Sequence, residues 1–339
     1  MPINTLQTIT MDSVHAAPAA ASVEWLWNGF LMPGDIALLT SQWKTGKTTL
    51  LSGLLRHLAD GKPFLGRATR PARAFVVSEE SHAQWGERLR LTPIGPHVEL
   101  LARPFRGRPT PDEWELLIDR AIGAKTELFV VDPIASFLPG RSESEATSVL
   151  ESLQPLLRMT AAGIAVLLLH HPRKKASEIG SSARGSGALL GFVDTSLELS
   201  RADRWDMESN RRLIRAQSRR GETPARLAYE WNRATGAFTL TADPRQRQFE
   251  ENWVAIHALL KERTEGISSR EVAEYWPDEG ARPNKNAIYA WMNIAFDHKL
   301  VRREGQGTRM KPWRYRLEND NDRYRDELPP LEPLEPLRW

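Results

Sequence analysis

The stretch IALLTSQWKTGKTTL, residues 36–50, places a phosphate-binding loop between an apolar, strand-like run and a helix-like run. It fits the pattern GxxxxGK[ST], except that Ser41 stands at the first glycine. In such a loop, backbone N–H groups surround the phosphates and the lysine, here Lys47, reaches the β and γ phosphates. The hydroxyl of Thr48 binds Mg²⁺ at the start of the helix. A chance GKT at a helix start is the alternative, and the flanking strand and helix argue against it.

Two residues of this loop carry backbone expectations. Gly46 permits a close approach of the backbone to phosphate that a side chain would block. Ser41 is tolerable in place of glycine provided that its φ angle stays negative. The predicted nucleotide-binding residues are Ser41, Gln42, Trp43, Lys44, Thr45, Gly46, Lys47, Thr48 and Thr49.

Outward from the loop, apolar strand-like runs alternate with helix-like stretches. The expected strands are residues 36–39, 74–77, 98–101, 128–131 and 164–169, and the expected helices are residues 47–58, 84–91, 111–122 and 146–159. Shorter strand-like patches follow without long helices between them, at residues 195–199, 212–216, 225–230 and 237–240. This order predicts an α/β fold with a mostly parallel sheet that ends in antiparallel hairpins.

Acidic residues end two of the expected strands, where ligands collect in an open α/β sheet. Asp132 ends LFVVD, which is typical of a Walker B strand whose carboxylate holds Mg²⁺, although Asp132 could instead cap the turn before Pro133. Glu79 and Glu80 end AFVVSEE, where a carboxylate can orient and deprotonate an attacking water. We favour Glu79 for this role. Alternatively, both glutamates simply begin the next helix.

A histidine pair, His170 and His171, ends the strand at residues 164–169. One of the two is placed to touch the γ-phosphate and to report hydrolysis to the loop that follows. The alternative is a purely structural hydrogen-bonding pair. A metal site is disfavoured, because no further histidine or acidic cluster stands at ligand spacing.

A second pattern begins after the polar residues 243–248, where we place a domain boundary. Three expected helices, residues 249–262, 269–276 and 285–298, precede a basic hairpin at residues 301–317, which is the order of a winged helix-turn-helix. The predicted parts are therefore a flexible N-terminus (1–20), a nucleotide-binding domain (21–242), a winged-helix domain (245–317) and an acidic, proline-rich tail (318–339). The tail offers a protein-binding segment, or is only a solvated terminus.

The third C-terminal helix and the hairpin are rich in cations, which suits phosphate contacts on duplex DNA. The predicted DNA-binding residues here are Lys285, Arg302, Arg303, Arg309 and Lys311. A protein-docking role for the module is the alternative. The apolar residues of the third helix, namely Ile288, Trp291, Met292 and Phe296, are assigned to its core.

Composition sets broad limits. The chain has 339 residues, a net charge of +3, a pI near 9.2 and no cysteine, which excludes disulfides and thiolate metal sites. The Ala-rich residues 16–21 lack the pattern of a signal peptide, and the longest apolar run, residues 164–169, is too short to span a bilayer. We therefore expect a soluble, cytoplasmic protein for which a nucleic-acid partner is allowed but not required.

Five motifs in order resemble the RecA-like ATPases of the hexameric replicative helicase group, in particular the RepA-type helicases of plasmids and mobile elements. They are SQWKTGKTTL, SEES followed by GERL, the strand ending in Asp132, LLLHHPRK and ARGSGALLGFVDTSLEL, within residues 25–240. The resemblance implies ATP and Mg²⁺ as ligands, a hexameric ring, a catalytic Glu79 and a γ-phosphate sensor at His171. It also implies a loop at residues 173–184 that tracks single-stranded DNA, with the cations Arg173, Lys174, Lys175 and Arg184; Arg184, Gly185, Ser186 and Asp194 match the family's RGS and downstream Asp positions.

In this group a basic residue from the neighbouring subunit completes the ATP site. Arg219 occupies the matching place and Arg220 is the second choice, although Gln217 stands where the family has lysine. Without this resemblance, the two arginines equally fit a solvated basic hairpin.

The predicted function is therefore that of an ATP-hydrolysing, DNA-dependent motor of a mobile element, a ring-forming helicase or translocase. The alternative is an ATP-switched DNA-binding regulator or initiator. A small-molecule kinase is disfavoured, because no acceptor-binding lid is evident.

Overall fold

The computed structural model describes residues 10–12, 24–138, 146–171, 187–202, 208–221, 223–277, 282–308 and 310–318. The chain forms two compact units, one of residues 1–199, 215–223 and 232–238 and the other of residues 200–214, 224–231 and 239–339. Most of the predicted N-terminal segment and nearly all of the proline-rich tail lie outside the described residues. The predicted boundary near residue 243 stays a prediction.

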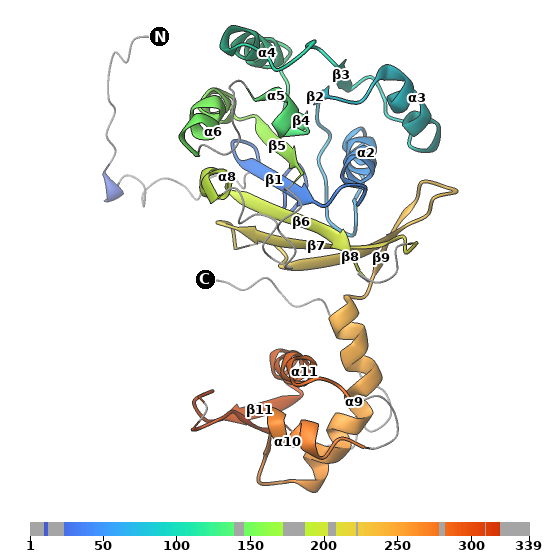
Figure 1. The fold of residues 1–339 in the computed structure, drawn as a ribbon, viewed down its shortest axis with the longest axis vertical. Coiled ribbons are helices and arrows are strands. Elements are labelled where there is room, and N and C mark those ends of the chain that lie inside the picture. The colour runs from blue at the N-terminus through green and yellow to red at the C-terminus, as the bar shows by residue number, and fades with distance from the viewer. Residues whose placement is uncertain are drawn as a thin grey trace. The chain divides into compact units, whose positions relative to one another are not determined.

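The described residues form a nine-stranded sheet in the order β3-β2-β4-β5-β1-β6-β7-β8-β9 (Figure 1). The strands are β1 (Ile36–Ser41), β2 (Ala74–Ser78), β3 (Val98–Ala102), β4 (Leu128–Asp132), β5 (Ala165–His170), β6 (Thr195–Arg201), β7 (Arg211–Ser218), β8 (Arg226–Trp231) and β9 (Phe238–Thr241). Every pairing from β3 to β6 is parallel. The mostly parallel α/β sheet is thus confirmed, and it supports the RecA-like core that the resemblance implies.

Strands β6 to β9 follow one another both in sequence and in the sheet. Parallel neighbours need a crossover of about a dozen residues or more, whereas these strands are joined by shorter connections. They therefore form the antiparallel end of the sheet that the sequence predicts.

Helices follow most strands of the parallel part. They are α2 (Lys47–Leu58), α3 (His82–Leu91), α4 (Pro111–Gly123), α5 (Ile134–Phe137), α6 (Ala146–Leu153), α7 (Leu156–Ala161) and α8 (Gly187–Phe192). The single helix expected at residues 146–159 is wrong, because the chain breaks it into α6 and α7 at Pro155, which has no N–H to continue the ladder. The short helices α5 and α8 were not predicted.

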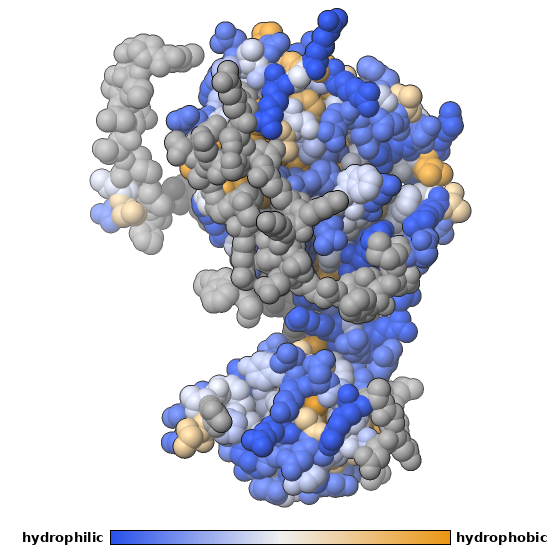
Figure 2. Space-filling view, viewed as in Figure 1, coloured by the Kyte–Doolittle hydropathy of each residue, from blue (hydrophilic) through white to orange (hydrophobic). Residues whose placement is uncertain are grey.

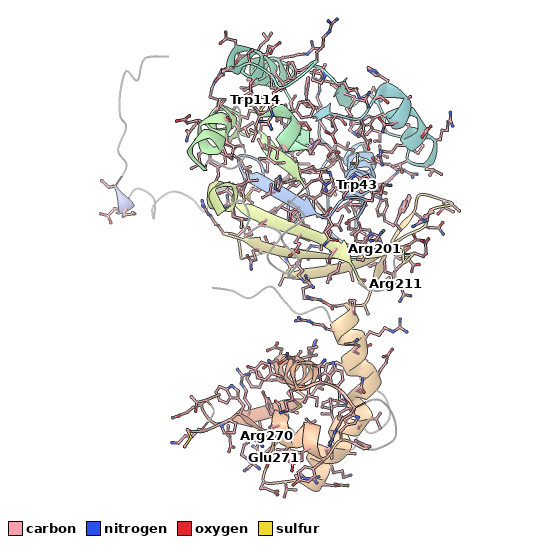
Figure 3. The ribbon with its side chains drawn as sticks, viewed as in Figure 1. Trp43, Trp114, Arg201, Arg211, Arg270 and Glu271 are labelled. Carbon is pink, nitrogen blue, oxygen red and sulfur yellow. The ribbon has the colours of Figure 1, made fainter. Side chains whose placement is uncertain are left out.

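The core of the parallel part surrounds its four central strands. Every residue of β1, β2 and β4 is buried. Trp114 of α4 (Figure 3) is only 1% exposed, and its indole Nε1 donates to the carbonyl of Ser152 at 3.1 Å. Burial of large apolar side chains stabilises a fold by about 1.5–3 kcal/mol each. The sheet is consequently a rigid base for the loops at its carboxyl edge.

The C-terminal part has its own hydrophobic core. It contains α9 (Pro244–Glu262), β10 (Ile267–Ser268), α10 (Ser269–Glu274), α11 (Lys285–Asp297), β11 (Val301–Glu304) and β12 (Arg314–Leu317), with the strands in the order β10-β12-β11. Ile288, Trp291 and Met292 are buried as predicted, and Phe296 packs against the same core. Helix α9 begins at Pro244, earlier than the expected start at residue 249, and the Asp243 side chain caps it at the N–H of Arg245.

Hydrophilic residues cover most of the described surface in the view of Figure 2. Among the helices that the structure describes, none is long and apolar enough to cross a membrane.

Candidate functional site

The carboxyl ends of four parallel strands meet at one edge of the sheet. Strand β5 lies between β1 and β4, and Thr40 of β1 is paired with His170 of β5. On the other side of β4, Ser78 of β2 is paired with Asp132 of β4. The residue after Ser78 is Glu79, whose N–H donates to the carbonyl of Asp132 at 3.0 Å. The phosphate-binding loop, the Walker B aspartate, the favoured glutamate and the histidine pair therefore share one edge.

The loop from β1 to α2 has the backbone that a phosphate cradle needs. Gly46 has a φ of 104°, which glycine adopts readily, and Lys44 has a φ of 59°. Ser41 has no positive φ, as its place in the motif requires. The Ser41 hydroxyl donates to the carbonyl of Gln42 at 2.8 Å, as does the Thr45 hydroxyl. These bonds brace the loop, while Gln42, Trp43 and Lys44 at its tip are exposed.

Lys47 is buried at the centre of the site, with 4% of its surface exposed. Its Nζ donates to the Ser41 hydroxyl and to Nδ1 of His171, both at 2.8 Å. Burial lowers the pKa of Lys47 to about 8, and the nearby carboxylates of Asp132 and Glu79 limit the fall. At neutral pH the group is therefore mostly an ammonium.

His171 accepts this hydrogen bond through Nδ1, so its own proton is on Nε2. Burial, followed by the charge of Lys47, lowers the pKa of His171. The ring is thus neutral at physiological pH, and it faces the lysine that the motif assigns to the phosphates.

Thr48 and Asp132 face each other, with the Thr48 hydroxyl donating to Oδ2 of Asp132 at 2.7 Å. Burial raises the pKa of Asp132 to about 6, the bond from Thr48 opposes this, and Glu80 adds to it. A buried carboxylate beside a hydroxyl suits Mg²⁺, which prefers oxygen ligands and keeps several waters or phosphate oxygens. Among the described residues, no group of three or more histidines or acids stands together as a metal site. Mg²⁺ in proteins commonly takes one or two carboxylates together with substrate phosphates.

The two glutamates after β2 have different partners. Both oxygens of Glu80 accept from Nη2 of Arg88 at 2.8 Å, and Arg88 also donates to the Thr49 hydroxyl at 3.4 Å. Glu79 is exposed, and its Oε2 instead accepts from the hydroxyl of Ser136 at 2.6 Å. Glu80 thus forms an ion pair, whereas among the described residues the carboxylate of Glu79 accepts from a neutral hydroxyl.

A family model described as "AAA domain" (AAA_25) matches residues 4–177, which is just over half of the chain. The chain belongs to this family. Membership supports ATPase activity and implies the binding of a nucleotide with a divalent metal, which Thr48 and Asp132 fit.

Two solved structures resemble the AAA domain protein. One is an ATPase domain that is 13% identical, covers 68% of this chain and 96% of its own, and has a TM-score of 0.49. The other, the flagellar accessory protein FlaH from Methanocaldococcus jannaschii, is 10% identical, covers 62% and 90%, and has a TM-score of 0.45. The search of curated proteins found no match.

Arg219 does not reach the nucleotide site of its own AAA domain. Its guanidinium donates to Oδ1 of Asp194 and to the carbonyl of Gly191, both at 3.3 Å. Oδ2 of Asp194 accepts from the N–H of Ile36, which begins β1, whereas the phosphate-binding loop follows the far end of this six-residue strand. The two ends lie about 17 Å apart at 3.3 Å per residue.

Arg220 lies at the same amino edge of the sheet. It forms a two-pronged ion pair with Asp35 at 2.8 and 3.0 Å. Neither arginine is therefore placed to act on a nucleotide bound to its own chain.

The structure separates the predicted DNA-binding residues into three groups. Five of them, Arg173, Lys174, Lys175, Arg184 and Arg309, lie outside the described residues. Lys285, Arg302 and Lys311 are exposed. Arg303 is packed instead: its Cζ lies 3.9 and 4.7 Å from the ring centroids of Phe296 and Trp313, and it donates to Asn293 at 3.2 Å. These contacts hold Arg303 between α11 and the hairpin, so we do not include it among the proposed phosphate contacts.

Two neighbours of Glu79 were not predicted from the sequence. Ser136 lies on α5, and Arg103 lies just after β3. Both reach Glu79 only because β2 lies between β3 and β4. No local pattern encodes that arrangement.

Proposed function

We propose that this AAA domain protein hydrolyses ATP with Mg²⁺ and uses the energy to move on single-stranded DNA as a ring, as a helicase or translocase of a plasmid, phage or other mobile element. The observation that carries the proposal is the meeting of Lys47, Thr48, Asp132 and Glu79 at one sheet edge. Each of the four has the chemistry that hydrolysis of a γ-phosphate needs.

The proposed roles follow from the contacts. Lys47 exchanges its bonds to Ser41 and His171 for the β and γ phosphates. Bound Mg²⁺ would neutralise phosphate charge. Glu79 orients a water and takes its proton as the water oxygen bonds to the γ-phosphorus and the bond from that phosphorus to the leaving ADP oxygen breaks.

His171 is proposed to sense this change. Its Nδ1 accepts from Lys47 at 2.8 Å, and it loses this partner when Lys47 turns to phosphate. Only Pro172 separates His171 from residues 173–184, the segment to which the helicase resemblance assigns contact with single-stranded DNA. The position of the histidine thus supports a connection between hydrolysis and DNA.

The proposed ring rests on Arg219. Arg219 lies at the amino edge of the sheet, away from the phosphate-binding loop of its own chain, and this position supports the proposal that it completes the site of another subunit. The resemblance assigns this arginine finger to the neighbour, and a hexamer is the assembly it implies.

The C-terminal part is proposed to be a winged helix that binds duplex DNA. Support comes from the order of three helices followed by the antiparallel pair β11–β12, and from the exposed cations Lys285, Arg302 and Lys311. Such modules also dock proteins.

An ATP-switched DNA-binding regulator is the second candidate, because the same C-terminal cations serve it equally well. Displacement of streptavidin from the end of biotinylated single-stranded DNA distinguishes the two. A motor is expected to speed displacement in the presence of ATP, and the Lys47→Ala variant, which lacks the phosphate-binding lysine, is expected to leave it at the spontaneous rate. If the wild-type protein binds DNA and hydrolyses ATP but displaces no streptavidin, the switch is the better description.

A further inference from the structure

We infer that Ser136 and Arg103 are positioning residues that hold Glu79 in place for the attacking water. The inference rests on the proposed function, in which Glu79 is the catalytic carboxylate. In the described structure neither residue forms a hydrogen bond to the phosphate-binding loop, so we assign their effect on hydrolysis to Glu79. Arg103 also donates through Nη2 to Oε1 of Gln84 at 3.4 Å.

Ser136 fixes the carboxylate of Glu79. Its hydroxyl donates to Oε2 at 2.6 Å, although the glutamate side chain is exposed and has the rotamer freedom of a long side chain. Ser136 lies on α5, which begins at Ile134, two residues after Asp132. The hydroxyl therefore ties Glu79 to the same chain segment that carries the proposed metal ligand.

Arg103 fixes the backbone of Glu79. Its Nε donates to the Glu79 carbonyl at 2.8 Å, and its own N–H donates to the carbonyl of Ser78 at 2.8 Å. The residue adopts a φ of 49°, a left-handed conformation that is unfavourable for a side chain other than glycine and that is often retained at functional sites. Since the Glu79 N–H also donates to the carbonyl of Asp132, both the N–H and the carbonyl of Glu79 are hydrogen-bonded.

The contrast with Glu80 indicates why these partners suit a catalytic group. Arg88 neutralises Glu80 with a cation on both oxygens, whereas Ser136 holds one oxygen of Glu79 with a neutral hydroxyl. Within the part of the chain that the structure describes, no hydrogen bond to the other oxygen of Glu79 is seen, which leaves it for a water. Misplacement of a catalytic group by about 1 Å can cost about 10²-fold in rate, so orientation alone is a sufficient role.

The first test is Ser136→Ala. We expect kcat for ATP hydrolysis to fall about tenfold with KM for ATP unchanged, because one hydrogen bond to a carboxylate is lost outside the nucleotide contacts. Ser136→Thr keeps the hydroxyl and should restore most of the rate. In a Glu79→Gln background, Ser136→Ala should cause no further loss of the residual rate.

Arg103 is tested with Arg103→Gly, which suits the left-handed backbone and removes only the side chain. We expect a lower kcat and an unchanged KM. Lys125→Gly is the matched control, because Lys125 has a φ of 54°, is exposed and lies beyond the end of α4. This control should keep the wild-type kcat.

Three results would overturn the inference when Glu79→Gln strongly lowers, but does not abolish, hydrolysis. One is a wild-type kcat for both Ser136→Ala and Arg103→Gly. The second is a further loss of the residual rate when Ser136→Ala is added to Glu79→Gln, and the third is failure of Ser136→Thr to recover activity, since each of these two indicates a general structural role. If Glu79→Gln itself hydrolyses ATP at the wild-type rate, the catalytic assignment of Glu79 fails instead.

Discussion

Replacing Glu79 with glutamine is expected to lower kcat for ATP hydrolysis by about 10²–10⁴-fold, the usual contribution of a positioned general base. The amide keeps the size of the side chain and can still accept the bond from Ser136, but it cannot take a proton from water. ATP binding should persist, because Lys47 and Thr48 are unchanged. Steady-state hydrolysis and equilibrium nucleotide binding, measured on the same preparation, check both parts.

Glu80→Gln is the matched control for this prediction. Glu80 is held by both oxygens on Arg88, and its amide would keep one of those bonds. The loss of one hydrogen bond at a distance from the phosphates should cost about tenfold or less. If Glu80→Gln were inactive and Glu79→Gln active, the roles of the two carboxylates would be reversed.

Arg219→Ala is expected to lower ATP hydrolysis by about 10³–10⁵-fold, the range for loss of an arginine finger. The fold should survive, because the Arg219 side chain is 66% exposed and its ion pair with Asp194 contributes little at the surface. Activity should return in part when Arg219→Ala and Lys47→Ala subunits are mixed. A mixed ring contains interfaces with an intact loop on one side and an intact arginine on the other.

Arg220→Ala tests the second choice, because Arg220 lies at the same edge but pairs with Asp35. A mixture of Arg219→Ala and Lys47→Ala that is no more active than its components would exclude action between subunits. If Arg220→Ala alone were inactive, and ATP hydrolysis recovered when it was mixed with Lys47→Ala, the arginine finger would be assigned to Arg220 instead.

The strands, the helices and the loop motif were predictable because they are local. The expected helix at residues 47–58 matches α2, and the strand that ends at Asp132 matches β4. The break at Pro155 is also encoded locally, since proline removes a ladder donor, although the apolar pattern of residues 146–159 predicts a single helix. Helix α5 has only four residues, too few for a periodic pattern to show.

The partners within the site were not predictable, because they depend on strand order. Nothing in the sequence states that β5 inserts between β1 and β4, yet this places His171 against Lys47. In the same way, the choice between Glu79 and Glu80 depends on Ser136 and Arg88, which adjoin them only in the folded sheet. Patterns of polarity locate strand ends, but they do not state which ends are neighbours.

The most direct measurement is the rate of ATP hydrolysis by the wild-type protein as single-stranded DNA is added, with the oligomeric mass determined in the same samples and Lys47→Ala as the inactive control. We predict that the rate rises with DNA and that active samples contain a ring. Equal rates with and without single-stranded DNA would contradict the proposal that this ATPase is a DNA-dependent motor.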